Sequence, residues 1–374
     1  MAKTKKREDG LYHKNLVVGK KKDGSYIRKS IYAKTKHELN MKITEVTQQL
    51  NEGIMVWENG ITFSELADIW FEQYNPMATE KWKYRTKSLL KCHLIPTIGD
   101  IKIKDLKQIH LQTIISNRAK EGYATSTMKK IKQTAECIMR VAINSDLLTK
   151  NPFSNVKIPV VEPMERRALS PEEIALVTDH WQGNLFGIGA MIMLYAGLRI
   201  GELLALDWKT DVDLDNKIIH VTKTRDLLKN HVSIKEPKTK AGFRDVPIPD
   251  ILYNALLLVR QEKGLVCPDT KGRLMSGAAQ KSAWNTFMNH LNVAAGGRTA
   301  QNKRPQIQVI ERFTPHMLRH TYATMLFDAG VDVKSAQKFL GHADIEVTLA
   351  IYTHLTKFKE EQAINALNVH LAKI

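Results

Sequence analysis

The sequence predicts a multidomain α+β protein in which helices predominate. A small sheet-plus-helix module is expected at residues 1–55 and an all-α bundle at 60–152. A linker at 153–167 leads into a mainly α domain with a small antiparallel sheet at 168–374. Three observations predict this division: a length of 374 residues, a change from β-type to helical periodicity near residue 60, and a proline-containing stretch without a period before residue 168.

The first module has the pattern of a β-hairpin. Residues 11–18 and 25–33 are dense in β-branched and aromatic side chains, and residues 20–24 form a turn between them. A twisted basic ribbon of this kind can enter a DNA groove, although the module is too small to enclose an active site. The DNA contacts expected from it are Lys20, Lys21, Lys22 and Arg28.

A single helix is expected to follow the hairpin. Thr35 and Glu38 have the spacing of a capping box. Apolar residues then recur every three or four positions and give one apolar face, on which the hairpin can pack: Leu39, Ile43, Val46 and Leu50.

The pattern is wholly helical from Thr62 to Ser145. We expect helices at 64–74, 80–93, 107–121 and 126–145, with turns at Asn75-Pro76, Pro96 to Gly99 and Gly122. Basic residues on such a bundle suit contacts with a phosphate backbone, although a solvated surface would look similar. The candidates are Lys81, Lys83, Arg85, Lys87, Lys129, Lys130 and Lys132.

The last domain is expected to begin with a capped helix at Ser170-Pro171-Glu172-Glu173. Helical patterns run to about Trp208 and resume after a strand-rich middle, and the last expected helix is 359–372. The expected strands are 217–223, 231–235 and 244–248.

The charge favours a polyanionic partner. The chain carries 56 Lys and Arg against 39 Asp and Glu, a formal net charge of +17. Most of the excess lies in the first 160 residues. The longest uncharged apolar run, 185–198, is shorter than the roughly 20 residues that a membrane span needs, so nucleic acid is favoured over a membrane.

The cysteines and the N-terminus indicate a reducing cytosol. The three cysteines, Cys92, Cys137 and Cys267, are too far apart for a zinc knuckle or a redox pair. The basic start has no apolar run behind it, so it lacks the middle of a signal peptide.

Four segments of the last domain carry candidate chemistry, although each has an ordinary explanation alone. Arg199 could pair with Glu202 on a surface. His316 and His320 are four apart, but no third metal ligand accompanies them, so no metal site is expected. The segments are Ala196-Gly197-Leu198-Arg199-Ile200-Gly201-Glu202-Leu203, Pro237-Lys238-Thr239-Lys240, His316-Met317-Leu318-Arg319-His320, and Leu340-Gly341-His342 with Tyr352 ten residues later.

Together these residues suit phosphoryl transfer without a metal or nucleotide cofactor. Arg199 and Arg319 can hold the oxygens of a phosphodiester, and His316 shares a helical face with Arg319. A tyrosine of ordinary pKa about 10 needs nearby cations or a base to act as a nucleophile. Tyr352 would then form a covalent phosphotyrosine, while Lys238 protonates the leaving oxygen.

The order of these segments resembles the tyrosine recombinase family, and in particular the integrases of phages and integrative conjugative elements. The resemblance implies an arm-type DNA-binding domain, a core-binding domain and a catalytic domain, in that order. It assigns phosphate binding to Arg199 and Arg319 and nucleophilic attack to Tyr352. His316 matches the active-site residue between the arginines, and His342 the second histidine, which supports the phosphate and the tyrosine. Lys238 matches the general acid, but Lys235 and Lys240 are close enough to compete, and Glu202 is expected to orient Arg199.

The resemblance also implies the biological activity and the partners. The enzyme would cleave and rejoin DNA through a 3′-phosphotyrosine to integrate and excise a mobile element, in the bacterial cytosol and at the nucleoid when bound. Four protomers would act on double-stranded core and arm attachment sites through a Holliday junction, with an excisionase or a host DNA-bending factor as accessory partner. The C-terminal helix at 359–372 would dock either on its own domain or on a neighbouring subunit.

Three alternatives stay open at this point. A non-catalytic DNA-binding regulator would explain the charge, but it would not need Tyr352 in order with the arginines. A metal-dependent nuclease should show a cluster of acidic residues, and none accompanies these segments. A chromosome-dimer resolvase of the same family shares the last two domains only, so the front module favours an integrase.

Overall fold

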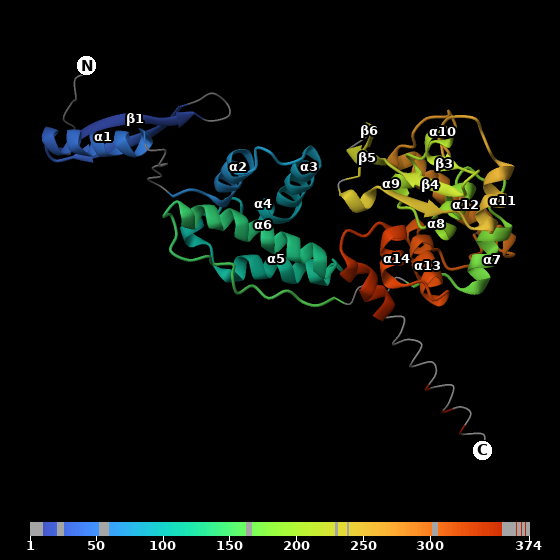
Figure 1. The fold of residues 1–374 in the computed structure, drawn as a ribbon. Helices are drawn as coiled ribbons and strands as arrows, with labels where there is room; N and C mark the ends of the chain where they lie inside the picture. Colours follow the sequence, from blue (N-terminus) through green and yellow to red (C-terminus); the bar gives the residue numbers. More distant parts are fainter. Residues whose placement is uncertain are drawn as a thin grey trace. The chain divides into compact units, whose positions relative to one another are not determined.

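The computed structural model divides the chain into two compact units, Met1–Met164 and Glu165–Ile374 (Figure 1). Helices predominate in both, and the sheets are small and antiparallel, so the expected fold class is confirmed in outline. The structure describes residues 10–20, 26–51, 60–161, 167–228, 231–237, 239–300 and 306–353, with positions 364, 368 and 371.

The first unit begins with the expected hairpin. Strands β1 (Tyr12–Lys20) and β2 (Tyr26–Ala33) pair antiparallel, with a bulge between Val17 and Gly19 that increases the local twist. The structure does not describe the side chains of the four DNA contacts expected from this module. Lys21 and Lys22 lie outside the described residues, and only the backbone is described at Lys20 and Arg28.

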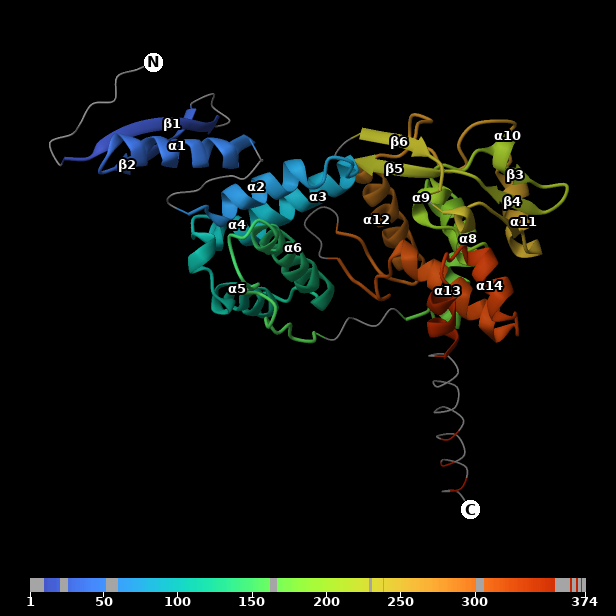
Figure 2. The same cartoon turned by 60° about the vertical axis from the view of Figure 1, so that its left-hand side comes forward.

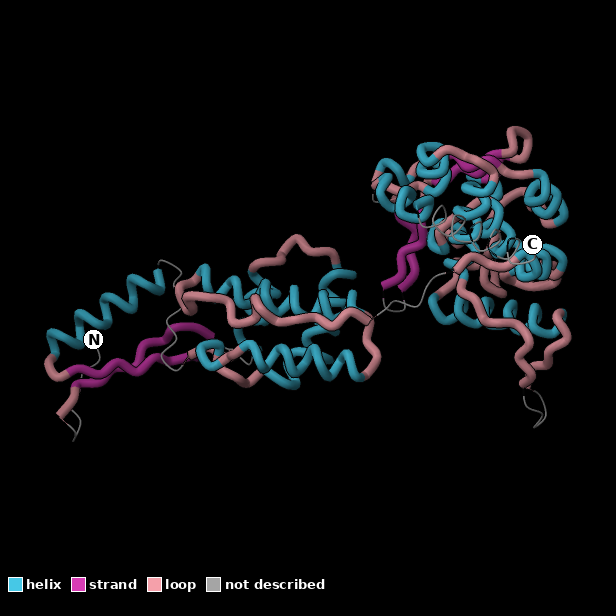
Figure 3. Tube along the Cα trace, turned by 90° about the horizontal axis from the view of Figure 1, so that it is seen from below, coloured by secondary structure: helices cyan, strands magenta, loops and turns pink. Residues whose placement is uncertain are grey.

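Helix α1 (Lys36–Asn51) lies along one face of this hairpin (Figure 3). Thr35 caps it by accepting the Glu38 N–H at 3.1 Å, and the Glu38 carboxylate accepts the N–H of Lys34 rather than that of Thr35. The buried side chains between helix and hairpin form a small core of their own: Ile31, Ala33, Leu39 and Val46. The side chain of Leu50, the last residue of the expected apolar face, is outside the described part.

The rest of the described first unit is a helical bundle around one apolar core (Figure 1). Its elements are α2 (Phe63–Gln73), α3 (Glu80–Leu89), the π-turn η1 (Leu90–Leu94), α4 (Ile95–Ile98), the 3₁₀ turn η2 (Ile103–Asp105), α5 (Gln108–Lys120) and α6 (Thr125–Asn144).

The expected turn at Pro96–Gly99 is wrong for its first three residues, because the chain stays helical to Ile98 and turns only at Gly99. The π-turn carries it from α3 into α4, where Pro96 occupies the first turn. The first turn of a helix is the position that tolerates proline best. Leu94 and Ile98 are fully buried, so core packing favours the continued helix.

Residues 153–161 pack on this bundle. Phe153 is fully buried. The ammonium of Lys132 donates to the carbonyls of Ser154 and Val156 at 3.1 and 2.9 Å. Lys132 therefore fastens the end of the unit to α6, with side-chain bonds from Gln112 and Thr125 adding further ties.

The second unit is built around helix α8 (Gly187–Tyr195), which is buried along nearly its whole length (Figure 2). A helix that is apolar all round belongs in a core. The expected cap at Ser170 is confirmed at the start of α7, where Ser170 and Glu173 form a capping box. The other helices are α7 (Pro171–Asp179), α9 (Ile200–Leu203), α10 (Trp208–Asp211), α11 (Asp250–Leu258), α12 (Gly277–Ala294), α13 (Pro315–Asp328) and α14 (Val333–Leu340).

Two antiparallel sheets, rather than the one expected, occur in the described part of this unit. The order in the first is β3-β4-β7, and β5 and β6 form a separate hairpin (Figure 2). Strand β5 was not expected, because its residues are all half-buried and show no alternation of apolar and polar side chains. The strands are β3 (Val212–Asp213), β4 (Ile218–Val221), β5 (Thr224–Leu228), β6 (His231–Lys235) and β7 (Arg244–Pro247).

Most of the expected C-terminal helix at 359–372 lies outside the described residues. The three of its positions that are described, 364, 368 and 371, are helical. Among the helices that the structure does describe, none combines the length and the apolar character needed to cross a bilayer.

Candidate active site

The loop between α8 and α9 places Arg199 at the start of a helix. Gly197 has φ +63°, and a Cβ there would lie 2.2 Å from the ring of Tyr322, so only glycine fits. Arg199 is the N-cap residue of α9, and its side chain is 38% exposed. The turn in the segment Ala196 to Arg199 thus presents this guanidinium to the surface of the unit.

Glu202 orients Arg199, as expected. Its Oε2 accepts the backbone N–H of Arg199 at 2.8 Å, and its Oε1 accepts Nη1 at 2.8 Å. Both oxygens also accept from Arg244 on β7, at 3.1 and 2.8 Å. Sequence reasoning missed Arg244, although alternation along β7 puts it on the buried face with Val246.

The carboxylate of Glu202 is ionised in this arrangement. Burial raises its pKa, but the hydrogen bonds and charge of Arg244, together with the charge of Arg199, outweigh burial and lower the pKa to about 2. A group with this pKa does not exchange protons near pH 7. Glu202 is therefore a fixed anion between two arginines.

Arg319 lies on α13 with its side chain buried. Its Nη1 donates to the carbonyl of Gly197 and its Nη2 to that of Leu340. Burial and then the positive charge of Arg199 lower its pKa to about 9, which still leaves it charged at neutral pH. His316 lies three residues earlier on the same helix and is exposed.

Three successive carbonyls at the C-terminal end of α14 each accept a hydrogen bond from an arginine. The Phe339 carbonyl accepts Nε of Arg244 at 2.8 Å, that of Leu340 accepts Arg319, and that of Gly341 accepts Nη2 of Arg199 at 2.7 Å. The last carbonyls of a helix lack partners within it and carry partial negative charge, so guanidinium groups suit them well.

His342 follows this helix end directly. Gly341 is left-handed, with φ +63° and ψ +44°, and turns the chain so that Nδ1 of His342 lies 2.8 Å from the buried hydroxyl of Thr348. Burial, with the charges of Arg319 and Arg199, lowers the pKa of His342 to about 4. The imidazole is therefore neutral at physiological pH.

Tyr352 lies in the helical residues 345–353 and is 8% exposed. Its hydroxyl donates to the carbonyl of Val331 at 2.9 Å, and its ring meets that of Phe327 edge-on at 5.1 Å. Burial and the charge of Asp332 raise its pKa. The phenol is thus protonated and bonded to backbone in this state.

The three lysine candidates for the general acid differ in what the structure describes. Lys238 itself lies outside the described residues. Lys235 on β6 forms an ion pair with Asp226 across the hairpin at 2.6 Å. Lys240 is exposed in the 3₁₀ turn η3 (Lys240–Gly242).

The structure brings Arg199, Arg319 and His342 onto one frame with Arg244 and Glu202. Two further residues escaped sequence reasoning. The buried Tyr322 packs against Gly197, and Thr348 holds the His342 ring. Both look like ordinary core or helix residues in the sequence, so no local signal marks them.

Several basic residues of the bundle have partners within it. Lys83 pairs with Glu80 at 3.2 Å, and Lys87 lies over the ring of Phe71. The ammonium of Lys132 donates to the carbonyls of Ser154 and Val156. Lys129 and Lys130, in contrast, are exposed on α6.

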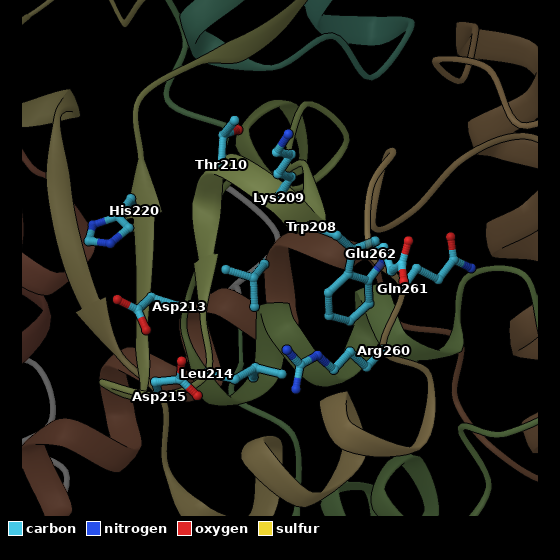
Figure 4. Close-up of a pocket in the computed structure, with 11 residues that line it drawn as sticks. Trp208, Lys209, Thr210, Asp213, Leu214, Asp215, His220, Arg260, Gln261 and Glu262 are labelled. Atoms are coloured by element: carbon cyan, nitrogen blue, oxygen red, sulfur yellow. The ribbon is translucent and has the colours of Figure 1, made fainter.

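A pocket of about 760 Å³ lies elsewhere on this unit, beside β3 and β4 (Figure 4). Its lining holds none of the candidate catalytic residues, and its acidic and basic side chains do not gather around one point (Figure 4). In the part of the chain that the structure describes, no group of three or more His, Cys, Asp or Glu side chains is arranged to hold a metal ion. The lining residues are Trp208, Lys209, Thr210, Val212, Asp213, Leu214, Asp215, His220, Arg260, Gln261 and Glu262.

Comparison with known families covers most of this chain. Residues 184–359 match the phage integrase family, and residues 62–117 match the N-terminal SAM-like domain of phage integrases. The chain belongs to the phage integrase family. The resemblance to tyrosine recombinases seen in the sequence is thereby confirmed.

Relatives of this phage integrase family member match along most of their length. A tyrosine recombinase XerC-like protein of Caldanaerobacter subterraneus is 26% identical, covering 96% of this chain and 95% of its own. The ICEBs1 integrase of Bacillus subtilis is 23% identical, covering 97% and 98%. The chain is accordingly a DNA strand-transferring enzyme that carries out site-specific recombination of mobile elements.

Solved structures share the fold of this integrase. The Tn1549 transposon integrase in complex with circular intermediate DNA superposes with a TM-score of 0.64 at 22% identity, covering 82% of this chain and 100% of that one. A lambda integrase tetramer bound to a Holliday junction gives a TM-score of 0.55 at 15% identity, covering 92% and 93%.

Proposed function

We propose that this integrase cleaves and rejoins DNA through a 3′-phosphotyrosine on Tyr352, and that it integrates and excises a mobile element. One observation carries the assignment of the site: Arg199 and Arg319 are fixed on adjacent carbonyls of one helix end, with neutral His342 next in the chain. Two guanidinium groups and an imidazole at one point form a site for a phosphodiester.

The arginines bind the scissile phosphate in this proposal. Arg199 keeps Nε and further N–H groups for a ligand, and its partial exposure allows DNA to reach it. Arg319 acts from a buried position, where a charge is weakly screened and stabilises the developing negative charge more strongly than in water. Both are held before substrate arrives, so little reorganisation is needed.

The histidines assist the same phosphate. Nδ1 of His342 is committed to Thr348, which leaves Nε2 to meet a phosphate oxygen or the tyrosine. A bound phosphate anion would offset the arginine charges that lower the pKa of His342. His316, on the same helical face as Arg319, is the second candidate to receive the phenolic proton.

Tyr352 must leave Val331 before it can attack. The hydrogen bond that it gives up is worth on the order of 1 kcal/mol, so DNA contacts can offset the loss. The phenolic oxygen then bonds to phosphorus, the bond from phosphorus to the 5′-oxygen breaks, and the phenolic proton passes to an imidazole. The 5′-oxygen takes a proton from a lysine, and attack by a 5′-hydroxyl reverses each step.

The general acid is Lys238, with Lys240 as its nearest rival. The ion pair between Lys235 and Asp226 makes Lys235 the weaker candidate, because proton donation would break that ion pair. Double-stranded core and arm sites, a homotetramer, a cytosolic and nucleoid location, and an excisionase or host DNA-bending factor complete the proposal. The net charge of +17 supports the DNA partner.

A nicked suicide DNA substrate carrying a core site from the element's ends tests the proposal. Cleavage releases a short fragment that cannot religate, so the covalent adduct accumulates and appears as a shifted band on a denaturing gel. We expect the adduct with wild type, without added metal and with chelator present, and none with Tyr352→Phe. An adduct that survives Tyr352→Phe would mean that another tyrosine is the nucleophile, and tight binding without any adduct would favour a non-catalytic regulator.

A further inference from the structure

We propose that Arg244 is a positioning residue for strand cleavage, which holds the phosphate-binding Arg199 in place through Glu202. The inference rests on the proposed function, because it assumes that Arg199 binds the scissile phosphate. Its starting point is that Arg244 contacts both Glu202 and the end of α14 and is shielded from solvent.

The contacts of Arg244 use its whole guanidinium group. Nη1 and Nη2 donate to the two oxygens of Glu202, Nε donates to the carbonyl of Phe339, and Nη1 also lies 3.4 Å from the carbonyl of Gly242. Its side chain is 2% exposed. Because all three nitrogens of this buried guanidinium are already bonded to Glu202 or to backbone carbonyls, the effect of Arg244 on the reaction passes through these neighbours.

Glu202 transmits the effect to Arg199. Each of its oxygens is shared, Oε1 between Nη1 of Arg199 and Nη1 of Arg244, and Oε2 between the Arg199 backbone N–H and Nη2 of Arg244. Without Arg244 the carboxylate loses its largest favourable interaction, and burial would raise its pKa. Arg199 would then lose the fixed anion that orients it.

Arg244 also packs against the turn before His342. A Cβ at Gly341 would lie 2.7 Å from Nη1 and 2.9 Å from Cδ of Arg244, so the guanidinium packs directly on this left-handed turn. Arg244 thus links β7, α9 and the end of α14. The same turn supplies the carbonyl that binds Arg199.

The test is a double-mutant cycle on the rate of adduct formation with the suicide substrate. Arg244→Lys keeps the charge but cannot bridge both oxygens of Glu202 and the Phe339 carbonyl at once, and we expect the rate to fall about 10- to 100-fold. In an Arg199→Lys background the same change should cost less than about threefold, because the residue through which it acts is already altered. Binding of the intact core site should stay within about threefold throughout.

A matched control separates positioning from general damage to the fold. Arg167 also pairs with carboxylates in this unit, Glu173 at 2.6 Å and Glu311 at 2.8 Å, and lies outside the frame. Arg167→Lys should leave the cleavage rate within about threefold. Glu202→Gln, which keeps the shape of the side chain, should reproduce the loss of Arg244→Lys and serves if that variant does not fold.

Equal losses from Arg244→Lys in both backgrounds would overturn the inference, since an effect independent of Arg199 is a general structural one. So would a full rate for Arg244→Lys while Tyr352→Phe still abolishes the adduct, an outcome that leaves the proposed function intact. No adduct from wild type on a verified site would overturn the proposed function and this inference together.

Discussion

The carbonyl of Gly341 accepts a hydrogen bond of 2.7 Å from Nη2 of Arg199, although 142 positions separate the two residues. This bond joins the Ala-Gly-Leu-Arg and Leu-Gly-His segments, which the sequence shows only as separate motifs. Gly341 meets two further requirements that favour glycine. Its backbone has φ +63°, and a Cβ at this position would collide with Arg244.

Gly341→Ala should therefore slow cleavage as well as destabilise the fold. The left-handed conformation costs about 1–2 kcal/mol for a residue with a Cβ, and the added methyl would displace Arg244. We expect a lower urea midpoint and a loss of about tenfold or more in adduct formation. Gly183→Ala is the control, since Gly183 has φ +70° with no atom near its Cβ position, and it should change stability but not the rate.

Asp332→Asn should shift the pH profile of cleavage toward lower pH. The negative charge of Asp332 contributes to the raised pKa of Tyr352, so its removal makes the phenol easier to ionise. Asparagine can still accept the N–H groups of Lys334 and Ser335 that Asp332 caps. The same change at Asp207, which caps α10, should not move the profile; a shift of equal size there would exclude a specific effect on Tyr352.

His342 should make the second unit less stable in acid. Its folded-state pKa of about 4 lies below its ordinary value of 6.5, so the unfolded chain takes up the proton first. The resulting stabilisation is complete above about pH 6.5 and is lost as the pH falls toward 4. After allowance for partial exposure it is on the order of 1 kcal/mol. Urea midpoints between pH 7.5 and 4.5 should fall less steeply for His342→Gln, whereas exposed His231→Gln should follow wild type.

Deleting residues 1–55 should spare cleavage of a core site and impair integration. The hairpin and α1 have their own small core, separate from that of the bundle, so their loss leaves the bundle's packing intact. Adduct formation in vitro and integration frequency in cells are the two measurements. An unchanged integration frequency would contradict the arm-binding role of this module.

Replacing Lys129 and Lys130 with glutamine should weaken the dependence of DNA binding on salt. Each lost phosphate contact lowers the slope of log affinity against log salt by about 0.9. Lys132→Gln should leave this slope unchanged but lower Tm, because its ammonium holds the carbonyls of Ser154 and Val156. A reduced slope for Lys132→Gln would show that Lys132 reaches DNA after all.

Much of the fold could be predicted from periodicity and caps alone. The helices of the bundle, the cap at Ser170 and five of the strands lie close to their expected positions. The helix through Pro96 was not predicted, because a proline ends a helix or not according to its position in it. Here the π-turn at Leu90–Leu94 places Pro96 in the first turn of α4. Strand β5 was missed because no face of it is fully buried.

The candidate site was predicted only as far as the chemistry of single side chains indicates it. Arg199, Arg319 and His342 have side chains that are typical of a phosphate site. Arg244 works through a buried carboxylate and a backbone carbonyl, and an arginine on a short strand usually points to solvent. Contacts between distant segments decide such roles, and a single sequence does not contain them.

The bonds at the end of α14 have a consequence for sequence variation. Every residue supplies a carbonyl whatever its side chain, so the grip on Arg244 and Arg319 does not depend on the identities of Phe339 and Leu340. Leu340 is 1% exposed and Phe339 packs on the same small core, so core packing, and not the arginine contacts, limits which apolar side chains fit at these two positions. A library of apolar residues at 339 and 340 can therefore vary this small core, which includes Tyr322 and Ala323, while the arginines keep their backbone acceptors.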